Sequence, residues 1–81
     1  MQRFGEKLRV LRTQHNLTLR DLAAQLGYTA HGYVNAVEKG RKKPSLEFVL
    51  KVAALFDVTA DQLLRDDLEV EPTGADAEGE D

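Results

Sequence analysis

Residues 17–43, LTLRDLAAQLGYTAHGYVNAVEKGRKK, contain two short helical patterns separated by a glycine. In the first pattern, apolar residues recur at the i, i+3, i+4, i+7 spacing of an amphipathic helix: Leu19, Leu22, Ala23 and Leu26. Thr18, with Asp21 three residues later, is a capping-box pattern that starts this helix, and Gly27 ends it. A helix of about eight residues is not stable alone in water, so it must pack on neighbouring helices.

The second pattern predicts a helix from about Ala30 to Lys39, ended by Gly40. Its apolar positions form one narrow stripe: Tyr33 or Val34, then Val37. The other positions carry small or hydrogen-bonding groups rather than long aliphatic ones. Two short helices joined by a tight turn that contains glycine are typical of a helix-turn-helix unit, whose second helix enters the major groove of DNA.

Three further helices are expected on either side of this stretch. Phe4, Leu8 and Leu11 predict a helix that runs to about Gln14, before a break at Asn16. Ser45 caps a helix over about 46–56, which is apolar around most of its circumference and is therefore expected to be central. One face is lined by Leu46, Val49, Leu50 and Ala53, with Phe48, Val52 and Leu55 beside it. Thr59 and Gln62 form another capping box before a fifth helix, with apolar positions at Ala60, Leu63 and Leu64. The sequence thus predicts an all-α fold, a compact five-helix bundle that contains a helix-turn-helix.

Length and composition bound the class of protein. The 81 residues, 42% of them apolar, are enough for one small domain. The absence of cysteine excludes disulfides, thiolate zinc sites and cysteine nucleophiles. No apolar run approaches the roughly 18 residues of a membrane span, and no signal-peptide pattern opens the chain. We therefore expect a cytoplasmic protein with no membrane association.

Charge is divided unevenly along the chain. All eleven basic residues lie in 1–65 together with six acidic ones, which gives +5, whereas 66–81 hold eight acidic residues and no basic one, which gives −8. Such asymmetry is expected when a binding surface and a solvating tail share one chain. We therefore expect a folded, basic part over 1–66, which the helix-turn-helix pattern makes a DNA-binding domain, and an acidic tail over 67–81, flexible beyond about residue 71. The alternative is that this tail serves solubility alone.

Several spaced residues resemble a known family. The matching pieces are LR..R from Leu8, LT..DLA..LG from Leu17, GYV..VE.G from Gly32, and PSLE.VLKVA..F.VT.D.LL from Pro44. Over residues 3–65 the chain resembles the Xre/Cro family of phage-repressor-like and lambda-repressor-like helix-turn-helix domains. This resemblance implies sequence-specific binding of double-stranded DNA by a transcriptional regulator, more often a repressor than an activator. It also implies a prokaryotic or phage protein associated with the nucleoid.

One departure from the family pattern affects the second short helix. Between Gly27 and Gly40 the chain holds one residue more than the commonest family spacing, near Tyr28 and Thr29. The residue that caps the helix is therefore Thr29 or the one after it, and the first base-reading position is left open.

Four residues of this helix are candidates for reading bases: His31, Gly32, Asn35 and Ala36. The Asn35 amide can pair with adenine, and His31 can meet a guanine N7 or a phosphate. Gly32 costs about 1 kcal/mol inside a helix relative to Ala, which close approach of the backbone to DNA would offset. Ala36 can touch a thymine methyl group. The alternative is that these are exposed residues without a ligand.

The candidates for phosphate contacts lie beside these residues. Lys39, Arg41, Lys42 and Lys43 follow the helix directly, and Thr18 and Arg20 begin the preceding one. Cations that neutralise phosphates release counterions, so their binding weakens with salt. An ordinary solvated basic loop is the alternative.

The resemblance implies two further contacts. Arg12 and Glu38 stand where the family commonly has an internal ion pair, which orients the second short helix. Apolar residues near the end of the chain are candidates for a two-fold dimer contact: Phe56, Val58, Leu64, Leu68 and Val70. A homodimer would place two recognition helices roughly 34 Å apart on a pseudo-palindromic operator. Alternatively, Leu68 and Val70 fold back on the monomer.

Other function classes find less support in the sequence. Ser45 is the only serine and occupies a helix cap, and the two histidines lie on different elements. We therefore expect no catalytic residues, no metal site, no cofactor and no small-molecule ligand. The remaining alternative is a DNA-binding antitoxin or a protein-interaction adaptor that uses the acidic tail, although this tail has few apolar anchors.

Overall fold

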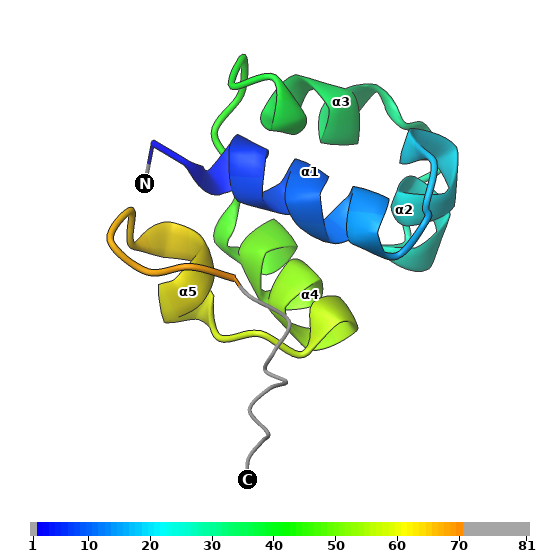
Figure 1. Ribbon diagram of the computed structural model, residues 1–81. Coiled ribbons are helices and arrows are strands. Elements are labelled where there is room, and N and C mark those ends of the chain that lie inside the picture. Colours follow the sequence, from blue (N-terminus) through cyan, green and yellow to red (C-terminus); the bar gives the residue numbers. More distant parts are fainter. Residues whose placement is uncertain (1, 71–81) are drawn as a thin grey trace, which may run out of the picture.

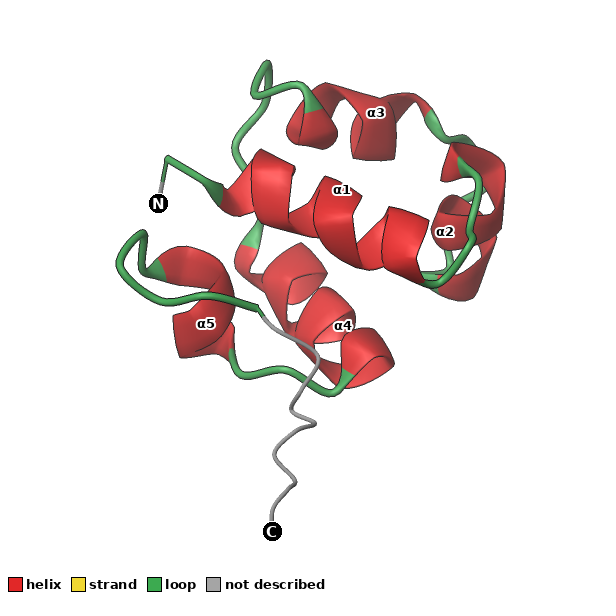
Figure 2. Cartoon of the chain, in the orientation of Figure 1, coloured by secondary structure: helices red, strands yellow, loops and turns green. Residues whose placement is uncertain are grey.

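The computed structural model describes residues 2–70, and this part of the chain is folded as five helices without a strand (Figure 2). The helices are α1 (Phe4–Gln14), α2 (Leu19–Gln25), α3 (Gly32–Glu38), α4 (Leu46–Phe56) and α5 (Ala60–Leu64). The expected all-α fold class is confirmed. The acidic tail expected over 67–81 lies, beyond Val70, outside the described residues.

The helix α1 lies in the middle of the bundle. Figure 1 shows that α3 lies along one side of α1, whereas α4 and α5 lie on its other side. The helix α2 lies across the C-terminal end of α1. The helix α1 packs on both α3 and α5, while α2 packs on α3. It therefore takes the central place that the apolar pattern favoured for 46–56.

Local hydrogen bonds set the starts of three helices. The Thr18 hydroxyl accepts a hydrogen bond from the Asp21 N–H, and the Asp21 carboxylate accepts one from the Thr18 N–H. Thr59 and Gln62 make the same reciprocal pair at α5. The Ser45 hydroxyl oxygen accepts the Phe48 N–H at α4. All three predicted caps are confirmed, because these side chains satisfy N–H groups that a helix start leaves unpaired.

The start of α3 differs from the expectation. The helix begins at Gly32, two residues after Ala30, and its N-cap is His31, whose side chain makes no capping hydrogen bond. Neither Thr29 nor the residue after it is the cap. The rings of Tyr28 and Tyr33 stack with their centroids 5.5 Å apart, so packing rather than a cap fixes this turn. Gly32 is therefore the first residue of α3, and the cost of an interior glycine does not apply to it.

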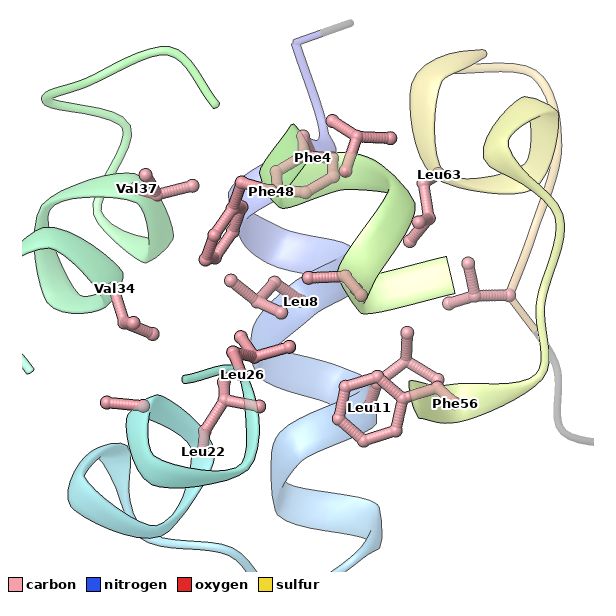
Figure 3. Close-up of a cluster of buried hydrophobic side chains, with 14 residues drawn as sticks. Phe4, Leu8, Leu11, Leu22, Leu26, Val34, Val37, Phe48, Phe56 and Leu63 are labelled. Atoms are coloured by element: carbon pink, nitrogen blue, oxygen red, sulfur yellow. The ribbon is translucent and has the colours of Figure 1, made fainter. Parts of the chain in front are cut away.

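The core gathers side chains from every helix. Figure 3 shows Phe4, Leu8 and Leu11 of α1 among the buried residues of the other helices. The Phe48 ring lies near the middle and meets the rings of Phe4, Tyr28 and Tyr33 at centroid distances of 6.2, 5.7 and 5.2 Å. The helix-turn-helix is thus anchored to α1 and α4 by aromatic packing, which adds roughly 0.5–1.5 kcal/mol per pair to the burial itself.

The helix α4 is buried on one face only, and not around most of its circumference as its apolar pattern indicated. Leu46 and Leu50 are 72% and 52% exposed, whereas the core takes the side chains of Phe48, Val49, Val52 and Phe56. Since α4 is apolar on most of its circumference, its sequence fits more than one buried face. The packing of Phe48 against α1 and α3 selects the face that is used.

Residues 65–70 return to α1 and hold its first turn. The Asp66 carboxylate accepts the N–H groups of Gln2 and Arg3, and the Arg3 guanidinium pairs with Glu69 at 3.0 Å. The Lys7 side chain, which is only 1% exposed, donates to the carbonyls of Gln62 (2.6 Å) and Arg65 (2.5 Å) at the end of α5. A cation at the negative end of a helix is favourable, so Lys7 joins α1 to α5.

No helix in the described part of the chain is long and apolar enough to span a membrane.

Candidate nucleic-acid interface

The helix α3 has one buried face and one outward face. Val34 and Val37 are completely covered by the bundle. The four expected base-reading residues occupy the other side, which follows from the spacing of 3.6 residues per turn: His31, Gly32, Asn35 and Ala36. His31 and Gly32 are exposed, and Asn35 and Ala36 are half-buried. The structure therefore brings these four residues together on one surface.

The outward face of α3 carries short side chains and a hydrogen-bonding group that is available to a ligand. Gly32 and Ala36 leave the helix backbone close to the surface. Apart from the chain neighbours of Gly32 and the backbone of its own helix, no atom lies within 4 Å of where a Gly32 side chain would begin. Among the described residues, no group pairs with the side-chain amide of Asn35. This amide has both a donor and an acceptor available for a ligand that approaches α3.

The basic loop, which we define as residues 39–43, continues directly from this face. Its four cationic side chains are all exposed: Lys39, Arg41, Lys42 and Lys43. Gly40 has φ +76°, and the N–H groups of Arg41 and Lys42 donate to the Ala36 carbonyl at 2.8 and 3.3 Å. These hydrogen bonds fix the loop to the end of α3, so its charges lie next to the outward face of that helix.

The other two expected phosphate contacts start α2. Thr18 and Arg20 are both exposed. The Thr18 hydroxyl oxygen accepts the Asp21 N–H at 3.0 Å. Donation from the Thr18 backbone N–H to the Asp21 carboxylate also holds the pKa of Asp21 below its usual range. Asp21 thus stays ionised at the start of α2.

Arg12 and Glu38 join α1 to the end of α3. The Arg12 Nε donates to the Glu38 carboxylate at 2.6 Å and Nη2 donates to it at 3.3 Å, while Nη1 donates to the Leu17 carbonyl at 2.8 Å. The two side chains are 15% and 6% exposed. A charge-assisted pair of this geometry, removed from most of the solvent, restricts where α3 can lie on α1.

Sequence reasoning missed the role of two tyrosines. The Tyr33 ring stacks on Tyr28, and the Tyr33 hydroxyl oxygen accepts the Ser45 N–H at 3.1 Å. Tyr33 thus links α3 to Ser45, the N-cap residue of α4. Two aromatic residues that flank a turn at a spacing of five were the available signal, but their partner Phe48 is distant in sequence.

The residues expected to form a dimer contact do not all reach the surface. Phe56 and Val70 are buried in the core of the monomer, and Val58, Leu64 and Leu68 are half-buried. The large apolar side chains that are exposed in the described part of the chain are Val10, Leu46 and Leu50. Leu46 and Leu50 are one turn apart, so they form a short apolar ridge on α4.

The described residues contain no group of three or more His, Cys, Asp or Glu side chains that could hold a metal ion. The two histidines have different surroundings, since the His15 ring packs on Phe56 and His31 is the residue before α3.

Comparison with known proteins agrees with this geometry. The helix-turn-helix family model matches residues 8–63. The HTH-type transcriptional regulator MJ0272 of Methanocaldococcus jannaschii is 40% identical over 57 residues, which cover 70% of this chain and 85% of that protein. The HTH-type transcriptional activator BcrR of Enterococcus faecalis is 41% identical over 61 residues, which cover 75% of this chain but 29% of BcrR.

Solved structures show the same arrangement of helices. The N-terminal DNA-binding domain of SinR from Bacillus subtilis matches with a TM-score of 0.75 at 28% identity, covering 85% of this chain and all of that domain. SinR in complex with DNA matches with a TM-score of 0.68 at 31% identity, covering 75% of this chain and 97% of that one. The family match covers more than half of the chain, and its residues are those of the helices described above. The chain therefore belongs to the helix-turn-helix family of the Xre and lambda-repressor type.

Proposed function

We propose that this protein binds duplex DNA in a sequence-dependent way and regulates transcription, with α3 lying in the major groove. The observation that carries the proposal is the outward face of α3. This face has short side chains, its Asn35 amide has no partner among the described residues, and the basic loop follows it directly. A major groove about 12 Å wide admits an α-helix whose outward side chains are short or reach base edges. The relative SinR has been crystallised with DNA.

The residues divide between the two kinds of contact. Asn35 and His31 would read base edges, while Gly32 and Ala36 let the helix approach them. The phosphate contacts fall to the cations of the basic loop and to the start of α2: Lys39, Arg41, Lys42, Lys43, Thr18 and Arg20. Phosphate contacts fix register and orientation, and base contacts supply sequence preference.

Selection of bound duplexes from a random pool, followed by titration of variants, tests this proposal. We expect Asn35→Ala to lose about 1–3 kcal/mol of binding to the selected site and little of its binding to random duplex. Lys42→Ala should weaken binding to both the selected site and random duplex, and it should lower the slope of log affinity against log salt concentration by about 1. Gln14→Ala removes an exposed amide from α1 and should change neither of these affinities. Absence of duplex binding even at low salt would contradict the proposal and favour an adaptor that binds protein.

We propose a homodimer as the bound form. The apolar ridge supports it, since Leu46 and Leu50 are the most exposed large apolar side chains in the described part of the chain. The half-buried Val58, Leu64 and Leu68 would extend the contact, with Phe56 and Val70 as the core beneath it. Two copies would then meet half-sites about 34 Å apart, or a multiple of that distance.

Sedimentation equilibrium tests the dimer. Leu50→Asp should give a monomer at concentrations where the unmodified chain associates, because a charge on the ridge has to be desolvated. Val10→Asp places the same charge on the other exposed apolar position and should leave association unchanged. A monomer at all concentrations, with and without operator, would refute the dimer.

We propose that the protein represses transcription by occupying its operator. We place it in the cytoplasm, at the nucleoid, and expect it to act without catalysis and without a cofactor. Since BcrR is named as an activator, a reporter gene downstream of the selected site decides the sign. Expression should fall when this protein is supplied, and a rise would show activation.

A further inference from the structure

Gly5 lies where the backbone of α1 comes closest to the backbone of α3. A Cβ at Gly5 would lie 2.5 Å from the Glu38 carbonyl oxygen, 2.6 Å from that of Val37 and 3.0 Å from the Glu38 carbonyl carbon. All three contacts are to main-chain atoms, which cannot rotate away as the end of a side chain can. The site therefore needs the absence of a side chain, and the reason is space, since Gly5 is not among the residues with positive φ.

The second attachment of α3 to α1 lies two turns further along the same face. Arg12 is seven residues after Gly5, a spacing that returns to the same side of a helix. Its guanidinium holds the carboxylate of Glu38, the residue whose carbonyl oxygen faces Gly5. The end of α3 is thus fixed by its main chain at Gly5 and by its side chain at Arg12, with Val37 buried beside them.

We infer that Gly5 is a positioning residue for DNA recognition: its missing side chain sets the distance at which the end of α3 is held against α1, and hence how α3 and the basic loop are presented to DNA. This inference rests on the proposed function. With a methyl group at Gly5, α1 and the Glu38 carbonyl have to separate from 2.5 Å to at least 3.0 Å, and to 3.4 Å for an ordinary contact. That movement reaches or exceeds the roughly 0.5 Å within which a binding constellation must be held.

The two kinds of DNA contact respond differently to such a movement. Hydrogen bonds to base edges weaken steeply with distance and angle, so sequence-specific binding depends on the position of α3. Attraction between cations and the phosphate backbone falls off slowly with distance, so non-specific binding depends little on the position of α3. A displaced α3 should therefore lower the ratio of specific to non-specific affinity, whereas simple loss of folded protein would lower both affinities equally.

The test compares Gly5→Ala with Thr13→Ala in the full chain. Thr13 is an exposed, uncharged residue of the same helix and already has a Cβ. We expect Gly5→Ala to bind the selected site at least about 10-fold more weakly and random duplex within about 3-fold of the unmodified chain, and Thr13→Ala to match the unmodified chain on both. An unchanged ratio for a folded Gly5→Ala protein would overturn the inference.

Two additional measurements separate the outcomes. Arg12→Lys keeps the charge but loses the planar guanidinium, so it loosens the second attachment and should lower the same ratio; if Gly5→Ala does not fold, an unchanged ratio in Arg12→Lys overturns the inference. Backbone amide NMR shifts of the free proteins should change in α3 far more than in α2 or α5 for Gly5→Ala. If the unmodified chain binds no duplex, the proposed function fails, and these shifts alone decide whether Gly5 positions α3.

Discussion

The helices α2 and α3 have seven residues each and follow one another, yet they are held in different ways. The start of α2 is closed by the reciprocal hydrogen bonds of Thr18 and Asp21. The start of α3 has no side-chain cap, since His31 has an αR backbone with ψ 0° rather than the extended backbone of a capping residue. The helix α2 is thus specified by residues within its own first turn, and α3 by contacts with the rest of the bundle.

This difference follows the roles of the two helices. A helix of seven residues needs stabilisation beyond its own hydrogen bonds. The tertiary contacts of α3 come from its inner side: Tyr33 on Phe48, buried Val34 and Val37, and the pair of Glu38 with Arg12. Because all of these contacts point inward, none of them uses a side chain of the outward face of α3, which is left to contact a ligand.

The largest effect is expected from breaking the attachment of α3. Arg12→Ala leaves Glu38 as a mostly buried, unpaired charge, and we expect a loss of roughly 3 kcal/mol in the free energy of unfolding. Chemical denaturation of Arg12→Ala, Glu38→Ala and the double variant measures it. The double variant should cost less than the two single losses together, by about 1–3 kcal/mol, since both remove one interaction. Strict additivity would show that the pair is not coupled.

A smaller effect is expected at the helix starts, where it should differ between α2 and α3. Thr18→Ala removes the cap of α2 and should cost about 1 kcal/mol of stability by thermal or chemical unfolding. His31→Ser introduces a capping residue at α3, but the αR backbone there does not direct its oxygen at the N–H groups, so stability should change by less than about 0.5 kcal/mol. Equal and opposite effects at the two positions would contradict the contrast between the helices.

The smallest effect is expected from acid, and it should fall on α2. The Thr18 N–H holds the pKa of Asp21 below its usual range, so ionised Asp21 stabilises the folded state. This stabilisation is present above the unfolded-state pKa of about 3.9 and is lost as the pH falls through the lower folded-state pKa. Asp21→Asn should therefore be less stable than the unmodified chain at pH 6, and the difference in stability should narrow as the pH is lowered from 6 to 3. A constant difference in denaturation midpoint across this range would exclude the mechanism.

Much of the fold could be predicted because its signals are local. Apolar spacing located α1, and polar side chains within one turn located the starts of α2, α4 and α5. The start of α3 was placed two residues too early, because no cap marks it and the Tyr28–Tyr33 stack that fixes the turn depends on Phe48. The apolar pattern of α4 did not show that Leu46 and Leu50 stay exposed, since apolar residues surround that helix and only contacts with its neighbours select the buried face.

The candidate site shows the same division. Residue types and spacing identified the outward face of α3 and the basic loop, and the family resemblance identified Arg12 with Glu38. The sequence contained no sign that Gly5 meets the end of α3. It left open whether Val70 folds back on the monomer, and the structure buries Val70, together with Phe56, in the core.

The sequence by itself therefore determined which segments are helical, where most of them begin, and which residue types line the surface proposed to meet DNA. These properties depend on hydrogen bonds and side-chain periodicity within a few residues. Only the tertiary structure decided the start of α3, its distance from α1 at Gly5 and the face that α4 buries. Each of these depends on close packing between segments far apart in the chain, where steric fit rather than local preference selects among arrangements.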